Sequence, residues 1–243
     1  MTMPNHVDTR LAITGDKEQL KTFREKHLLN VERVDYEGNK TGEFEDVFDF
    51  NTITPMPEEL EGTTSPRRTT SGLAQSIRNG ASKESIKEYK KQIKLADECE
   101  KKYGYSDWYS FKLAKWGTKC GAYGLEIINE ATGSIEIRYQ TAWRTATPIL
   151  CKLSEMYPDL KFKQHALDEG MNFAVTQEFT CGNCYEEHYD GEAMYDFCNE
   201  EFGHHYEKCK CGEWFDSSWV EDNHDASMCY ECNEAAIEEK EEA

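Results

Sequence analysis

Cysteines dominate the end of the chain. Seven of the ten follow residue 180, and most of them come in closely spaced pairs: Cys181, Cys184, Cys198, Cys209, Cys211, Cys229 and Cys232. Two thiolates one or two residues apart can bind the same tetrahedral Zn²⁺ from a single turn, and two such turns complete a four-coordinate site. A glycine after the second cysteine, as at Gly212, lets backbone N–H groups approach the sulfurs. The spacing therefore predicts a metal-binding module.

Seven cysteines and one histidine supply the eight ligands that two four-coordinate zinc ions require. The pairing we favour places one ion among Cys209, Cys211, Cys229 and Cys232. The other ion would take Cys181, Cys184, Cys198 and one histidine, which is His188, His204 or His205. Spacing alone leaves an interleaved pairing open, with Cys181 and Cys184 joining Cys209 and Cys211.

Disulfides and buried free thiols are the alternatives to metal binding. Disulfides are rare in cytosolic proteins, and the segment has few apolar residues among which seven thiols could be buried. A catalytic zinc keeps an open position for water, whereas thiolates fill both predicted sites. We therefore expect structural zinc, and a segment that folds only with the metal bound.

Motifs of enzymes are absent from the sequence. It lacks the phosphate-binding, nucleophile-elbow, zinc-protease and dinucleotide-binding patterns, and the His-x-Glu with Pro-Cys-x-x-Cys of zinc deaminases. We interpret the chain as a non-enzymatic protein, with an unrecognised site in the first domain as the remaining alternative.

Acidic charge is concentrated in the same cysteine-rich segment. The whole chain has a net charge of −19, and residues 181–243 account for −16 of it, with three Lys and Arg against 19 Asp and Glu. Such a segment repels nucleic acids and anionic membranes and favours basic protein surfaces. A protein partner is the prediction that follows.

Basic residues gather in one place only. Five lysines share one face of a predicted helix, namely Lys83, Lys87, Lys90, Lys91 and Lys94, with Arg67, Arg68 and Arg78 upstream. This face could bind phosphates. The alternatives are an ordinary solvated helix face and a surface that docks on the acidic segment of the same chain.

Apolar periodicity outlines the elements that must position these residues. Strands are predicted at 6–14, 45–54, 160–166 and 171–176, a hairpin at 123–143, and helices at 16–28, 82–103, 107–116 and 147–157. This order predicts an α+β domain over 1–180 with a ferredoxin-like (split βαβ) antiparallel sheet, helices on one face and a helical insertion at about 62–119. A zinc-ribbon-like module at 181–235 and an acidic tail at 236–243 would follow.

Several short motifs resemble the signature blocks of the YubB ferredoxin-like family. They are Met3-Pro-Asn-His-Val7, Phe48-Asp-Phe-Asn51 with Thr54-Pro-Met-Pro-Glu-Glu-Leu60, Trp116-Gly-Thr-Lys119, Thr141-Ala-Trp143, and Tyr157-Pro-Asp159 with Asp168-Glu-Gly170. The resemblance implies the fold and an origin on a phage, plasmid or other mobile element, and it implies no defined activity. The sequence departs from the family at Cys120, where an aromatic residue is usual, and the segment after residue 180 lies outside these blocks.

Together these observations predict a phage or mobile-element accessory protein that binds and modulates a host protein, for instance a defence or nucleic-acid-handling factor, through an acidic, zinc-stabilised surface. The alternative is a nucleic-acid-binding accessory protein that uses the lysine-rich helix and the zinc module. Without a secretory signal or a long apolar run, we expect the host cytoplasm and no membrane contact.

Overall fold

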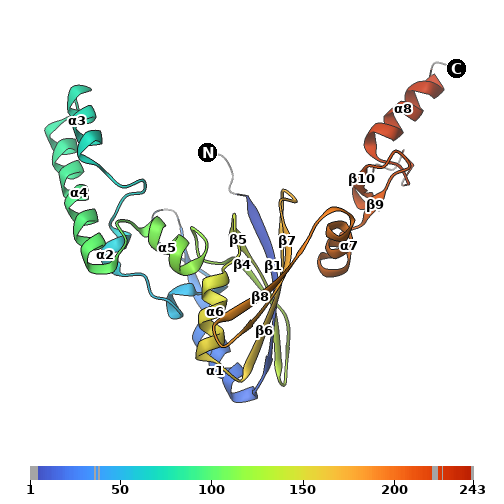
Figure 1. Cartoon of the computed structure of the whole chain (residues 1–243), viewed down its shortest axis with the longest axis horizontal. Helices are drawn as coiled ribbons and strands as arrows, with labels where there is room; N and C mark the ends of the chain where they lie inside the picture. The colour runs from blue at the N-terminus through green and yellow to red at the C-terminus, as the bar shows by residue number, and fades with distance from the viewer. Residues whose placement is uncertain (1–4, 36, 38, 221–223, 226, 242–243) are drawn as a thin grey trace.

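A six-stranded antiparallel sheet forms the centre of the molecule in the computed structural model, which describes residues 5–35, 37, 39–220, 224, 225 and 227–241 (Figure 1). The strand order is β4-β5-β1-β6-β7-β8. The strands are β1 (His6–Gly15), β4 (Tyr123–Ala131), β5 (Ser134–Ala142), β6 (Leu160–Asp168), β7 (Ala174–Thr180) and β8 (Asn183–Tyr189).

Four of these strands and two helices, α1 (Lys17–His27) and α6 (Thr147–Met156), follow the split βαβ pattern. The chain runs β1-α1-β4-β5-α6-β6, and β1 lies between β5 and β6, antiparallel to both. This arrangement confirms the predicted ferredoxin-like fold. β7 and β8 extend the sheet beyond β6.

Side chains along each strand point alternately to the two faces of the sheet. On β1, Leu11 and Ile13 are fully buried, and they belong to one core cluster with Phe23 of α1 and Leu150 of α6. α1 and α6 therefore cover this face. Asp16 caps the start of α1, because its carboxylate accepts hydrogen bonds from the N–H groups of residues 18 and 19.

The opposite face carries α7 (Gly191–Phe202). Phe197 and Cys198 of this helix are buried against Leu167 of β6 and Ala174 of β7, whose side chains point away from the main core. We predicted helices on one face only, and α7 corrects this. The sheet also continues past residue 180, because β8 pairs with β7 along its whole length.

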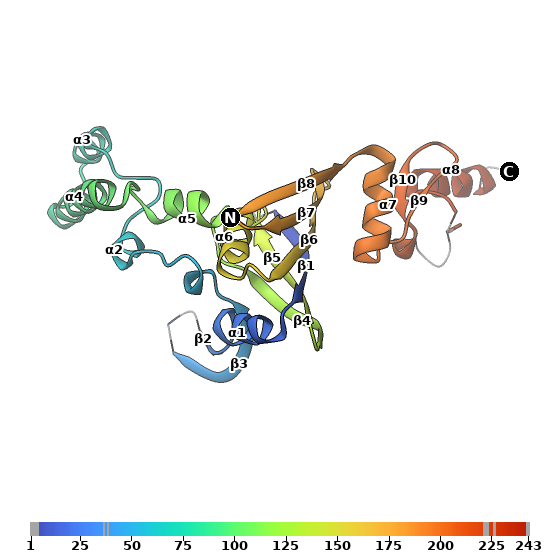
Figure 2. The same cartoon turned by 60° about the horizontal axis from the view of Figure 1, so that its bottom comes forward.

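The insertion between α1 and β4 is longer than the helical segment that we predicted. It starts with a two-stranded sheet, β2 (Leu28–Val34) and β3 (Lys40–Phe48). It continues with η1 (Phe50–Thr52), α2 (Glu58–Glu61), α3 (Thr70–Arg78), α4 (Lys83–Tyr103) and α5 (Trp108–Trp116). α3 and α4 form an arm that projects from one end of the molecule (Figures 1 and 2).

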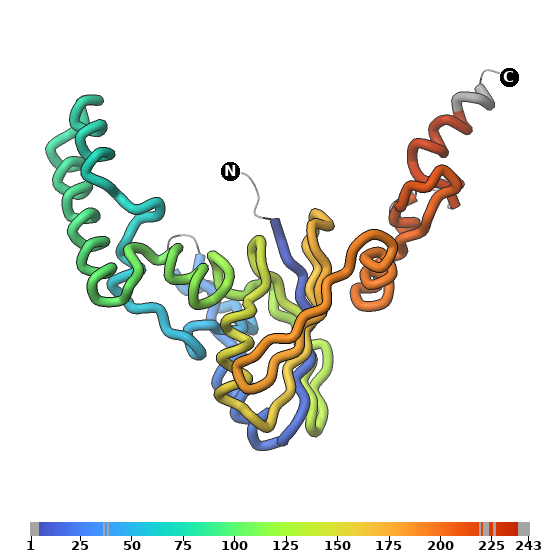
Figure 3. Tube along the Cα trace, viewed as in Figure 1, coloured from blue at the N-terminus to red at the C-terminus, as the bar shows by residue number. Residues whose placement is uncertain are grey.

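The chain leaves the sheet through α7 and ends in a small module at the other end of the molecule, as the tube trace of Figure 3 shows. This module contains β9 (Tyr206–Lys208), β10 (Trp214–Asp216), η2 (Ser217–Trp219) and α8 (Tyr230–Glu241). The predicted tail at 236–243 is the end of α8, except for residues 242 and 243, which lie outside the described residues, as do the first two of the Met3–Val7 motif. Within the described parts of the chain, each helix is too short or too polar to cross a membrane.

Candidate metal centre

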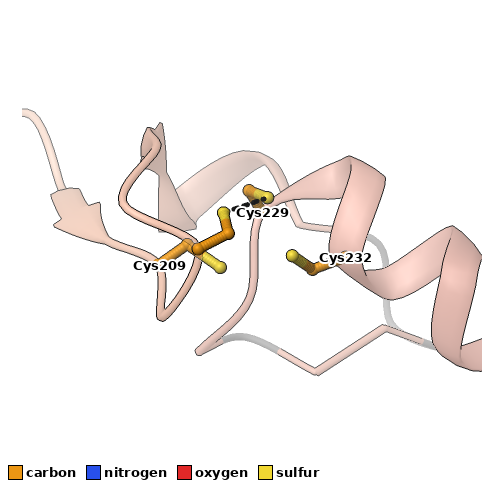
Figure 4. A group of neighbouring side chains, drawn as sticks. Cys209, Cys229 and Cys232 are labelled. Carbon is orange, nitrogen blue, oxygen red and sulfur yellow. Dashed lines mark hydrogen bonds between the residues drawn. The ribbon is translucent and has the colours of Figure 1, made fainter.

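Four cysteines of the C-terminal module meet at one point. The sulfur atoms of Cys209, Cys211, Cys229 and Cys232 all lie within 4.8 Å of one another. Figure 4 shows those of Cys209, Cys229 and Cys232 turned toward one another, and its dashed line marks the 3.6 Å contact between the sulfurs of Cys211 and Cys229. Four sulfur ligands arranged in this way could bind a metal ion.

The first pair lies in the turn of a short hairpin between β9 and β10. The N–H group of Cys209 donates to the carbonyl of Glu213 at 2.8 Å, and that of Gly212 donates to the carbonyl of Cys209 at 2.9 Å. Gly212 has a φ of +103°, which side chains rarely tolerate. Gly212 therefore allows the tight turn that directs both sulfur atoms to the same side.

The second pair lies where α8 begins, and Asn233 fixes the loop before it. This residue is 3% exposed. Its side-chain oxygen accepts from the N–H group of Asp225 at 2.7 Å, and its amide nitrogen donates to the carbonyls of Asp225 and Met228 at 3.0 and 2.9 Å. Asn233 is not among the residues predicted from the sequence, although its place four residues after Cys229, at helical spacing, was the available signal.

Cys209 and Cys232 have very different pKa values when no metal is bound. Backbone N–H groups of Cys211 and Cys229 hydrogen-bond to the sulfur of Cys209 and lower its pKa to about 6. The protonated thiol of Cys232 donates hydrogen bonds to the sulfurs of the same two residues, which stabilises the protonated form and raises its pKa to about 12. One thiolate forms easily, and a nearby cation is needed to ionise all four.

Cys181 and Cys184 lie in a different structure, the hairpin that joins β7 to β8. Thr180 pairs with Asn183, so Cys181 and Gly182 form a two-residue loop, and both have a positive φ, +48° and +81°. Positive φ at both central residues is the geometry of a type I′ hairpin turn. Cys184 packs against the main core, and burial raises its pKa to about 11.

The other predicted ligands are also spread apart. Cys198 is fully buried between α7 and the sheet, where burial raises its pKa to about 11. His188 pairs with Glu186 on β8 at 3.3 Å, and His204 lies 3.5 Å from Asp216. The structure brings together the four ligands of the favoured first site, and in the described part of the chain no second group of three or more possible ligands forms.

The five predicted lysines form one exposed stripe along α4, which we call the lysine stripe: Lys83, Lys87, Lys90, Lys91 and Lys94. Lys91 lies 4.0 Å from Glu88, and Lys94 lies 3.5 Å from Glu98. The other three lysines have no ion pair with any residue that the structure describes. The stripe therefore presents uncompensated positive charge.

The fold and the site define a ferredoxin-like α+β protein with a C-terminal four-cysteine cluster. Residues 122–207 match a family model described as the ferredoxin-like domain in Api92-like protein. A search of curated proteins gave no match. The family match agrees with the ferredoxin-like fold that the sequence resemblance implies. The matched family is described as Api92-like and not as YubB, and the match does not address a phage origin.

One solved structure is similar to this chain, the crystal structure of a protein api92 from Yersinia pseudotuberculosis. Its sequence is 8% identical, and the alignment covers 77% of this chain and 99% of that one with a TM-score of 0.42.

Proposed function

We propose that the four-cysteine cluster binds one structural zinc ion. A tetrahedral Zn²⁺ with Zn–S distances of about 2.3 Å separates its sulfur ligands by about 3.8 Å. The contact of 3.6 Å between Cys211 and Cys229, and the 4.8 Å limit for the whole group, fit this geometry. Four thiolates leave no open position for water, which supports a structural role.

We propose further that the zinc-stabilised module is the binding surface of a non-enzymatic accessory protein, carried by a phage or another mobile element, that modulates a host protein. The observation that carries this proposal is the net charge of −16 in residues 181–243. Several of these carboxylates are exposed on the described surface of α7, the module's hairpin and the start of α8: Glu192, Asp196, Glu200, Glu207, Glu213 and Glu231. A dense negative surface suits a partner with a basic surface.

Charge also argues against nucleic acid as the partner of this module. Zinc modules that bind nucleic acid carry Lys and Arg near the metal, whereas only Lys208 and Lys210 flank this cluster. The lysine stripe is the surface that supports the alternative, since three of its residues lack an acidic partner among the described residues.

Affinity capture from nuclease-treated host lysate tests the host-protein proposal. The test variant replaces Asp196, Glu200, Glu207 and Glu213 with their amides, and the control variant does the same to Glu18, Glu25, Glu58 and Glu61, which are exposed on α1 and α2. We expect a captured host protein to be lost with the test variant and kept with the control. If both variants kept the captured host protein, the acidic surface would not be its binding site. Nucleic acid that co-purifies without nuclease and disappears with it would support the nucleic-acid alternative.

A further inference from the structure

The arm has the opposite charge from the C-terminal module. Residues 62–103, which include α3 and α4, contain ten Lys and Arg against five Asp and Glu, a net charge of +5. The molecule is therefore strongly polarised, with a basic end and an acidic end.

The lysine stripe is the exposed surface of this basic end. α3 packs on another face of α4, where the Tyr89 ring lies beneath the Arg68 guanidinium at 4.8 Å. Closer to the C-terminal end of α4, the Arg67 guanidinium forms ion pairs with Glu100, at 2.7 Å, and with Asp97. These contacts hold the arm together and leave the stripe open to solvent.

α7 carries acidic residues with a matching repeat. Glu192, Asp196 and Glu200 follow one another at four-residue intervals, as Lys83, Lys87 and Lys91 do on α4. Each interval advances about 6 Å along a helix axis. Glu192 pairs with Lys208, whereas Asp196 and Glu200 are exposed and have no ion pair with any described residue. The acidic row on α7 can therefore lie along the basic row on α4, with carboxylates beside ammonium groups.

α4 and α7, which carry the two rows, lie on opposite sides of the central sheet in both views (Figures 1 and 2). They do not meet within one chain in this arrangement. We propose that the lysine stripe of one copy docks on α7 of a second copy. Such a head-to-tail contact uses different surfaces on the two partners, so it generates open chains or closed rings rather than a symmetric dimer.

Overall repulsion between copies limits this contact without preventing it. Each chain has a net charge of −19, and charges further apart than about 8 Å are largely screened at 0.15 M salt. Ion pairs in contact are screened less, and at 1 M salt the screening length of about 3 Å reaches them as well. The association is therefore expected at 0.15 M salt and lost at 1 M.

Sedimentation velocity on the purified, nuclease-treated, zinc-loaded chain tests this proposal with two matched charge reversals. One variant has Lys83→Glu and Lys87→Glu, and the other has Asp196→Lys and Glu200→Lys. All four positions are exposed, and circular dichroism checks that both variants fold. We expect wild-type protein to sediment faster as its concentration rises, each variant alone to stay monomeric, and an equal mixture of the two variants to recover the faster species.

Wild-type protein that stays monomeric at 0.15 M salt, or variants that associate as wild type does, would overturn the proposal. A mixture that fails to recover would show that these two surfaces do not contact each other. The contact uses part of the acidic surface of the proposed function, but the assay contains no host protein. A monomeric wild type would consequently reject self-association and leave host-protein binding untouched.

Discussion

The central sheet and the C-terminal module are stabilised by different means. One continuous apolar cluster joins the sheet to α1, α6 and the insertion, from β2 to α5. In the described residues after Phe202, by contrast, only Cys209, Cys229 and Asn233 are buried. A segment with so little apolar burial does not offset its chain entropy by packing alone. We therefore expect the sheet to fold by itself and the folding of the module to depend on what its cysteines bind.

Removing two of the four clustered cysteines should have the largest effect on the structure, and that effect should be confined to the module. We expect the double variant Cys229→Ser and Cys232→Ser to bind no zinc and to lose its structure after about residue 203, because structural zinc contributes about 10–16 kcal/mol of apparent binding free energy in small zinc modules. Zinc content and limited proteolysis measure this. Cys120→Ser, at an exposed position outside the cluster, is the control and should keep one zinc ion per chain.

Deleting a core side chain should destabilise the sheet and leave the module intact. Phe23 is fully buried, and its ring contacts those of His27, Phe48, Tyr157 and Phe162. We expect Phe23→Ala to lower the free energy of unfolding of the sheet by about 3–5 kcal/mol in denaturant titration and to leave the zinc content unchanged.

The matched control for that variant is Phe44→Ala, at a position 63% exposed. It should change the free energy of unfolding by less than about 0.5 kcal/mol. If Phe23→Ala released the zinc, the two regions would not be independent.

Mild acid should weaken the sheet through a buried histidine. His27 is 1% exposed, its ring nitrogens lie 2.6 Å from the Thr52 hydroxyl and 2.8 Å from the Tyr157 hydroxyl, and burial lowers its pKa to about 4. The unfolded chain, with a histidine pKa near 6.5, binds the proton first. The contribution of neutral His27 is therefore complete above about pH 6.5 and is lost as the pH falls toward 4, by about 3 kcal/mol.

Urea unfolding of the sheet between pH 7 and 4 measures this slope, and His27→Gln is the control because glutamine keeps hydrogen-bonding groups without titrating in this range. The variant should show a flatter pH dependence than wild type. Equal slopes in the two proteins would mean that other groups carry the acid sensitivity.

The smallest expected effect compares two helix N-termini. Asp16 caps α1 with hydrogen bonds to the N–H groups of Glu18 and Gln19 at 3.1 and 2.9 Å, whereas Asp190, in the same position before α7, makes no side-chain cap bond. Asp16→Ala should lower the free energy of unfolding by about 1 kcal/mol. Asp190→Ala should cost much less, and equal losses in thermal unfolding would contradict the difference in capping.

Local patterns made many of the helices and strands predictable. The hairpin at 123–143 and the helices at 82–103, 107–116 and 147–157 follow from apolar periodicity and capping residues, which act within a few residues. β3 shows where such patterns fail. Alternation predicted a strand to residue 54, but the strand ends at Phe48 because Asp49 caps a short turn of helix that begins at Phe50.

The four-cysteine cluster was predictable in part for the same reason. A turn such as that of Cys209 and Cys211 is local, so its spacing identifies it. Which second pair completes a site depends on contacts between distant segments, and spacing left two pairings open. Cys181-Gly-Asn-Cys184 has the spacing of a metal-binding turn and also that of a tight hairpin with glycine at its second position. The strand-like residues on either side of Gly182 were the signal for the hairpin.

β8 ends the sheet in the described part of the molecule, and its outer edge carries backbone N–H and C=O groups that no neighbouring strand pairs. Such an edge can recruit the strand of another molecule and start aggregation unless charged side chains prevent it. Glu186, Glu187 and His188 stand in the middle of this strand. If the negative charge of this strand were removed, solutions of this protein should become prone to fibrous or amorphous precipitation.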